Sequence, residues 1–111
     1  MRKRRAERDF FLKLKPTSGY GNNKKSFIYD FDKMFNEYHN DCSINDEVKL
    51  SIIFYFKHQC YADIDNLLKS LFDALKLKLL GDDSQIKEIN AKIIENSFTD
   101  GISVIIYSMK H

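Results

Sequence analysis

The chain has 111 residues, of which 43% are apolar and 31% are charged, a length and composition typical of one globular domain rather than a disordered segment. No apolar run is long enough to cross a bilayer, and the basic start MRKRRAER is not followed by the apolar core and cleavage site of a secretory signal. The two cysteines, Cys42 and Cys60, are too few for a disulfide framework and are expected to be free thiols of a cytosolic protein.

The charge is unevenly distributed. Residues 1–8 carry five Lys or Arg against one Glu, whereas the rest of the chain carries 13 Lys or Arg against 15 Asp or Glu. We therefore expect a flexible basic arm at residues 1–8 and a single domain over residues 9–111. Such an arm fits a polyanionic partner, and a solvated terminus without a partner is the open alternative.

The amino-terminal third predicts a strand, a loop and a short helix. Apolar and basic residues alternate over residues 9–15, which indicates a strand that Pro16 ends. Residues 17–25, TSGYGNNKK, are rich in turn formers and are expected to form a loop. Residues 30–41 show apolar residues at helical spacing, and either Asp30 or Asp32 can cap the start of this helix.

The remaining elements are three strands and one long helix. The strands are predicted at residues 47–56, 85–95 and 101–109, with a helix as the competing interpretation of 85–95. The helix is predicted at residues 66–80, with an apolar stripe of Leu68, Leu71, Phe72, Leu75 and Leu79. The order strand–helix–strand–helix–strand–strand predicts a small α/β domain of α+β type, with two helices packed on a mixed sheet.

Two acidic pairs flank the predicted long helix. If Tyr61–Asp65 is extended, Asp63 and Asp65 point to the same side, and Asp65 stands at the helix N-cap. Asp82 and Asp83 follow the helix, and a helix of this length spans about 22 Å. The pattern therefore leaves open whether the two pairs meet.

Clustered carboxylates suit a hard divalent cation such as Mg²⁺, which can activate a water and stabilise phosphoryl oxygens. Lys69 lies four residues after Asp65, so it can neutralise a carboxylate or contact a phosphate. Three simpler interpretations stay open. Asp65 can be only a cap, Asp65–Lys69–Asp73 only an exposed ladder, and Asp82–Asp83 only a polar turn.

Two other kinds of metal site fit the sequence poorly. An EF-hand loop is excluded, because Leu68 stands where the loop needs a glycine. A zinc site built on His39 and Cys42, or on His58 and Cys60, is disfavoured because neither spacing is that of a zinc knuckle.

The stretch DIDNLLKSLFDAL, followed by GDDSQI and AKII, resembles the RusA-type Holliday-junction resolvases. The family pattern is D-x-D-N-L-x-K, then a helix with Asp-Ala-Leu, then an acidic pair followed by a small or polar residue, Gln and an aliphatic residue. The matching residues are Asp63, Asp65, Asn66, Leu67, Lys69, Asp73, Ala74, Leu75, Asp82, Asp83, Gln85 and Ile86. The resemblance covers about residues 61–94.

The resemblance implies a homodimeric, Mg²⁺-dependent endodeoxyribonuclease, with Mn²⁺ as a substitute, that resolves four-way DNA junctions by paired nicks in recombination and repair. It implies catalytic and metal-binding roles for Asp63, Asp65 and Asp83 and a catalytic role for Lys69. Asp82, the neighbour of Asp83, is a candidate further metal ligand. It also implies that these acids gather in each subunit. The expected setting is cytoplasmic and nucleoid-associated, and resemblance to phage-borne members is compatible with a prophage origin.

The DNA-contact surface departs from the family, because the Pro- and Arg-rich opening of many members is replaced here by KPTSGYGNNKK. Phosphate contacts are therefore expected from basic residues without sequence readout: Arg2, Lys3, Arg4, Arg5, Lys24 and Lys25. Two rival functions stay open. One is a non-catalytic junction-binding module, and the other is a metal-dependent nuclease for other branched DNA.

Overall fold

The computed structural model describes residues 6–18, 21–38 and 44–109. The elements in chain order are β1 (Ala6–Leu12), α1 (Gly21–Tyr38), β2 (Val48–Tyr55), α2 (Ile64–Lys78), a 3-10 turn (Asp83–Gln85), β3 (Ile86–Ile94) and β4 (Gly101–Ser108). The predicted order and the predicted α+β class are confirmed. Within the described residues, no helix is long and apolar enough to cross a membrane.

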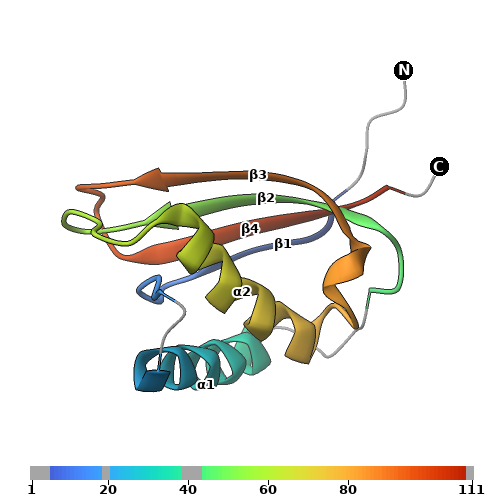
Figure 1. Ribbon diagram of the computed structural model, residues 1–111, viewed down its shortest axis with the longest axis horizontal. Helices are drawn as coiled ribbons and strands as arrows, with labels where there is room; N and C mark the ends of the chain where they lie inside the picture. The colour runs from blue at the N-terminus through green and yellow to red at the C-terminus, as the bar shows by residue number, and fades with distance from the viewer. Residues whose placement is uncertain (1–5, 19–20, 39–43, 110–111) are drawn as a thin grey trace.

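The four strands form one mixed sheet in the order β1-β4-β2-β3. β4 is antiparallel to both of its neighbours, whereas β2 and β3 are parallel. Both helices lie on the same side of the sheet (Figure 1). Because parallel strands need a crossover, α2 carries the chain from the end of β2 back to the start of β3. The start of α2 and the start of β3 therefore lie at opposite ends of the sheet.

The core lies between the helices and the sheet face that they cover. Along β2 the side chains alternate between buried and half-buried, as expected for a strand with one covered face. Phe27, Phe31 and Phe35 recur every four residues along α1 and are buried, and the ring of Phe10 from β1 packs in T-shaped contacts with the last two rings. The stripe of α2 is centred on Leu67, Leu71, Ala74 and Leu75, whereas Leu68 and Phe72 are only partly buried.

The first helix is longer than predicted. α1 begins at Gly21, so the predicted loop at residues 17–25 is wrong over its last five residues. Asp30 and Asp32 lie inside α1, and the predicted caps are therefore wrong. The reason is the buried stripe of phenylalanines, which begins at Phe27 and outweighs the turn propensity of the residues before it.

The other boundaries shift by a few residues. The first strand begins at Ala6 and ends at Leu12, so it includes three residues of the predicted arm, and residues 1–5 lie outside the described part. α2 begins at Ile64, which makes Asp63 the N-cap instead of Asp65. The strands predicted at 47–56, 85–95 and 101–109 are confirmed, and the helical alternative for 85–95 is excluded by its pairing with β2.

Candidate active site

Asp63 and Asp65 stand at the start of α2, on the end of the sheet where β2 finishes. The backbone of Asp63 is extended (φ −75°, ψ 148°), and its side chain makes no capping hydrogen bond. Asp65 lies in the first helical turn, and both side chains are exposed. The helix dipole favours negative charge here. Two exposed carboxylates thus lie two residues apart at the start of α2, and no capping hydrogen bond engages that of Asp63.

A pair of loops fixes the position of Asp63. The loop of residues 56–62 leads from β2 to α2, and the loop of residues 95–100 joins β3 to β4. Four cross-loop hydrogen bonds join them: Lys57 N to Asp100 Oδ1 (2.8 Å), Cys60 N to Glu95 Oε2 (2.6 Å), Asn96 N to His58 O (3.3 Å) and Ser97 N to Phe56 O (2.9 Å). The loop that leads into α2 is therefore held by hydrogen bonds to the loop of residues 95–100, which the sequence pattern did not predict.

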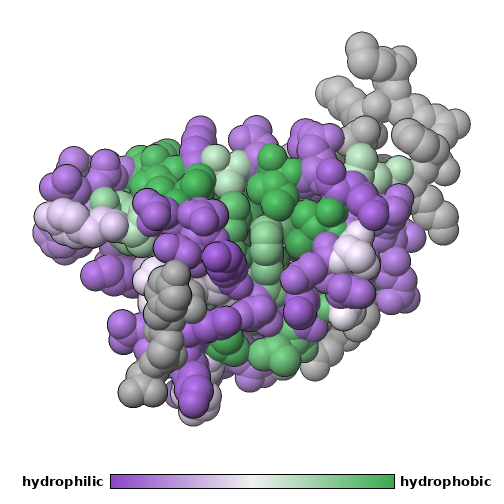
Figure 2. All heavy atoms as spheres, in the orientation of Figure 1, coloured by the Kyte–Doolittle hydropathy of each residue, from purple (hydrophilic) through white to green (hydrophobic). Residues whose placement is uncertain are grey.

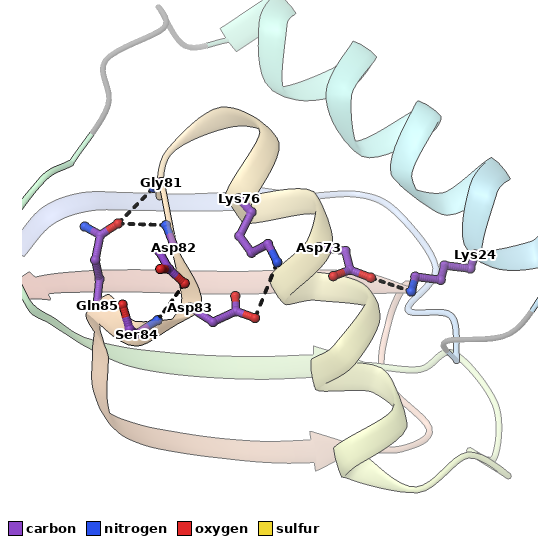
Figure 3. A network of polar contacts seen from close by, with 8 residues as sticks. All are labelled: Lys24, Asp73, Lys76, Gly81, Asp82, Asp83, Ser84 and Gln85. Atoms are coloured by element: carbon purple, nitrogen blue, oxygen red, sulfur yellow. Dashed lines mark hydrogen bonds and ion pairs between the residues drawn. The ribbon is translucent and has the colours of Figure 1, made fainter.

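Lys69 lies one helical turn after Asp65 and is exposed. It forms no ion pair with any residue that the structure describes. Asp73, the third member of the predicted ladder, instead pairs with Lys24 of α1 (Figure 3). Asp65, Lys69 and Asp73 therefore do not form the exposed ladder of ion pairs that was one interpretation of the sequence. Lys69 is left with an exposed positive charge one turn after Asp65.

At the other end of α2, Asp82 belongs to the fold. Its carboxylate accepts a hydrogen bond from Ser84 N at 3.2 Å, and Asp82 caps the 3-10 turn. Gln85 Oε1 accepts from Gly81 N (2.8 Å) and Asp82 N (3.0 Å), as Figure 3 shows. The Ser84 backbone N–H lowers the pKa of Asp82, with smaller contributions from the Ser84 side chain and Lys76.

Gln85 belongs to the family pattern, and the structure shows that its side chain links two segments of the chain. Its Nε2 donates to Ile44 O at 2.7 Å and to Asp46 O at 3.0 Å, so one amide joins the turn to the segment before β2. The one feature of the sequence that indicates this role is the amide of Gln85, which can both donate and accept hydrogen bonds.

Asp83 differs from its neighbour. Its contact among the described residues is an ion pair with Lys76 at 3.6 Å, and both side chains are about half exposed (Figure 3). An ion pair of this length and exposure is weak and exchangeable. Both acids of the pair are exposed, but the Asp82 carboxylate is hydrogen-bonded within the turn whereas Asp83 makes only this weak ion pair in the described part of the chain.

The two acidic sites do not meet within one chain. Asp63 precedes the first residue of α2 and Asp83 follows its last turn, so the helix, about 22 Å long, separates them. In the described part of the chain, no group of three His, Cys, Asp or Glu side chains could hold a metal ion. The expectation that the acids gather within each subunit is therefore wrong for the described residues.

The remaining predicted residues have simpler positions. Arg2 to Arg5, His39 and Cys42 lie outside the described residues. Lys24 and Lys25 lie on the first turns of α1 rather than in a loop, and Lys24 is engaged by Asp73. The Cys60 thiol donates to Ala62 O at 3.3 Å, and neither it nor His58 belongs to a metal-binding group within the described segments.

The family model described as Endodeoxyribonuclease RusA matches residues 22–107. The chain belongs to the RusA endodeoxyribonuclease family. The match runs from α1 to β4 and so includes both ends of α2. A comparison with curated proteins returned no match. Membership of the RusA family supports a nuclease with a role in resolving Holliday junctions.

Proposed function

We propose that this protein is a homodimeric, Mg²⁺-dependent endodeoxyribonuclease that resolves four-way DNA junctions by paired nicks. The observation that carries the proposal is the state of Asp63, a helix N-cap whose carboxylate caps nothing. An N-cap aspartate normally accepts a hydrogen bond from the first turn. Here Asp63 stands exposed beside Asp65 in the matched region of the RusA family.

The donor set fits a hard divalent cation. Asp63, Asp65 and Asp83 offer only carboxylate oxygens, which are the ligands of Mg²⁺, and Mn²⁺ accepts the same donors. When bound, such a cation supplies a Lewis acid that lowers the pKa of water and neutralises phosphoryl charge. Asp82 contributes less, because its carboxylate already accepts the Ser84 N–H. Lys69 places a positive charge near the scissile phosphate and offsets the charge that builds up there.

A second copy of the chain would complete the acid set. Asp83 stands where β3 starts, and Asp63 stands where the parallel strand β2 ends. A two-fold axis across α2 and β3 would therefore bring Asp83 of one subunit toward Asp63 and Asp65 of the other. This symmetry creates two equivalent sites, which suits paired nicks on a four-way junction.

Exposed apolar residues on β3 and α2 support this arrangement. β3 is an edge strand of the sheet, with Ile89 exposed, and Leu77 is exposed on α2. Figure 2 shows apolar side chains between polar ones over the side of the molecule that carries β3 and α2. An unpaired strand edge with apolar residues favours association with another chain.

A labelled four-way junction, incubated with protein in Mg²⁺ or in EDTA, tests the activity. We expect symmetric nicks in Mg²⁺ only, and none with Asp65→Asn. Asp73→Asn is the matched control, because Asp73 lies on the same helix but pairs with Lys24. Tight junction binding without cuts in any divalent metal would leave a binding module. Cutting of flaps in preference to junctions would leave the nuclease and change its substrate.

Mixing two inactive variants tests the shared site. In a heterodimer of Asp65→Asn and Asp83→Asn, an acid set shared between subunits leaves one intact site and one doubly defective site. We therefore expect single nicks from the mixture and none from either variant alone. If each subunit assembled its own acids, the mixture would be as inactive as its components.

A further inference from the structure

The paired loops that position Asp63 also present two aromatic rings to solvent. Phe98 lies in the loop of residues 95–100 and is fully exposed (102%), and Tyr61 lies in the loop of residues 56–62 and is 87% exposed. These are the two most exposed large apolar side chains among the described residues. A fully exposed phenylalanine does not contribute to the core, so its ring is accessible to a ligand.

The loops that carry these rings are braced rather than loose. The four cross-loop hydrogen bonds already described tie the two loops together. Asn96 adopts a left-handed backbone conformation (φ 55°), which asparagine tolerates better than most residues, and this shapes the turn two residues before Phe98. Two aromatic rings on a fixed support lose little conformational entropy when a flat ligand stacks on them.

The charge of the loops argues against a phosphate-binding role for them. Lys57 is the only Lys or Arg in the two loops, which also carry Glu95 and Asp100. Both carboxylates accept backbone N–H groups of the opposite loop. Attraction to the DNA backbone must therefore come from other parts of the protein. The contacts that these loops can make with DNA are through the aromatic faces of Tyr61 and Phe98.

Tyr61 also forms part of the wall of a cleft. The cleft has a volume of about 500 Å³ and lies between the 56–62 loop, the segment that precedes α1 and the first half of α1. Hydroxyl and amide groups of Thr17, Asn23 and Gln59 line it. Such groups can donate to and accept from the edges of a nucleobase.

We propose that Tyr61 and Phe98 stack against unstacked bases at the branch point of the DNA, with the cleft beside Tyr61 receiving the edge of one base. This inference rests on the proposed function and adds how branched DNA is distinguished from linear duplex. Base faces become accessible where strands exchange, whereas in a continuous duplex they are covered. Stacking is indifferent to base identity, so it selects for structure rather than for sequence.

Binding to a fixed four-way junction in EDTA, compared with binding to linear duplex, tests this inference. We expect Phe98→Ala and Tyr61→Ala each to weaken junction binding by between about fivefold and a hundredfold, with little change for the duplex. The dependence of affinity on salt should stay the same, because no phosphate contact is lost. Tyr29→Ala is the matched control, since Tyr29 is an exposed aromatic residue of α1.

A double-mutant cycle on the DNA side sharpens the test. Junctions with abasic nucleotides at the branch point should lose affinity for the wild-type protein and none for the Tyr61→Ala, Phe98→Ala double variant. Equal losses for both proteins would overturn the stacking, as would junction binding by the variants at wild-type strength. A shift of the variants to monomers in sedimentation would also overturn it, because the rings would then be subunit contacts.

The failure of this inference is distinguishable from failure of the proposed function. If the wild-type protein cuts junctions in Mg²⁺ and the ring variants bind and cut like it, only the stacking is lost. If the wild-type protein neither cuts junctions nor prefers them to duplex, the proposed function and the stacking fail together.

Discussion

The two ends of α2 carry the same residue type in opposite states. At the start of the helix, Asp63 and Asp65 are exposed, and Asp63 makes no capping hydrogen bond. At the far end, Asp82 accepts a hydrogen bond from Ser84 N and belongs to a turn that Gln85 fastens to the segment before β2. One end therefore binds the carboxylate of Asp82 into the fold, whereas at the other end Asp63 and Asp65 stay exposed, with no capping hydrogen bond from Asp63.

The difference shows that adjacency in sequence does not define a functional pair. Asp82 and Asp83 are neighbours and both are exposed, yet the Asp82 carboxylate accepts the Ser84 N–H whereas Asp83 makes only a weak ion pair with Lys76. Of the four acids, Asp63, Asp65 and Asp83 are therefore the ones whose carboxylates accept no backbone hydrogen bond within the described residues. If these two ends differ as the structure indicates, substitutions should separate loss of activity from loss of stability.

The largest effect on activity is expected from Asp65→Asn. If Asp65 binds the metal as proposed, removing its carboxylate should lower cutting by more than about a hundredfold, since a bound metal supplies several kcal/mol of transition-state stabilisation. The free energy of unfolding should hardly change, because Asp65 is exposed. Parallel junction-cutting assays and urea unfolding curves check both statements. A loss of stability as large as the loss of activity would remove the contrast between the two ends.

The largest effect on stability is expected from Gln85→Ala. This change removes the two hydrogen bonds that Oε1 accepts and the two that Nε2 donates. With part of the network exposed, the expected cost is about 2 kcal/mol of unfolding free energy. Gln85→Glu is the control, because it keeps the acceptor atoms and loses both donors. An unfolding midpoint in urea equal to the wild-type value would show that the turn is held in another way.

The sequence was sufficient to predict the elements whose apolar pattern is strong. The apolar stripe predicts α2, and the β-branched runs predict β2 and β4, because one face of each element must be buried. It was insufficient for α1, whose first turns, GNNKK, favour a loop locally and become helical through the burial of Phe27 further along.

The meeting of the acids could not be predicted for a different reason. It depends on the direction of β3, which is set by pairing with β2 and not by any local residue. The pattern D-x-D and the pair Asp82–Asp83 locate candidate ligands, but only the crossover shows that they occupy opposite ends of one subunit. The difference between Asp82 and Asp83 likewise depends on folded contacts, because Ser84 and Gln85 both form hydrogen bonds with Asp82.

A smaller, pH-dependent effect is expected from Asp82. Its pKa in the folded protein is lower than the usual 3.8, chiefly because the Ser84 N–H stabilises the carboxylate. The unfolded chain therefore takes up the proton first as pH falls. The contribution of Asp82 to stability is present above about pH 4 and is lost as pH falls through the lower folded-state pKa.

Asp82→Asn tests this linkage, because asparagine keeps the capping oxygen and does not titrate. Urea unfolding at pH 7, 5, 4 and 3 should show a shallower acid loss for Asp82→Asn than for the wild-type protein. Identical acid profiles for Asp82→Asn and wild type would mean that the capping bond does not favour the ionised form.

The smallest effect is expected from Lys76→Gln, which removes the ion pair with Asp83. Both side chains are about half exposed and 3.6 Å apart, so the change in unfolding free energy should be less than about 0.5 kcal/mol. If Lys76 merely neutralises Asp83 until a metal ion binds, its loss should not lower cutting at saturating Mg²⁺. Activity measured across a Mg²⁺ titration distinguishes metal binding by Asp83 from a purely structural ion pair with Lys76. A large drop in stability with unchanged activity would place Asp83, like Asp82, among the residues that hold the fold.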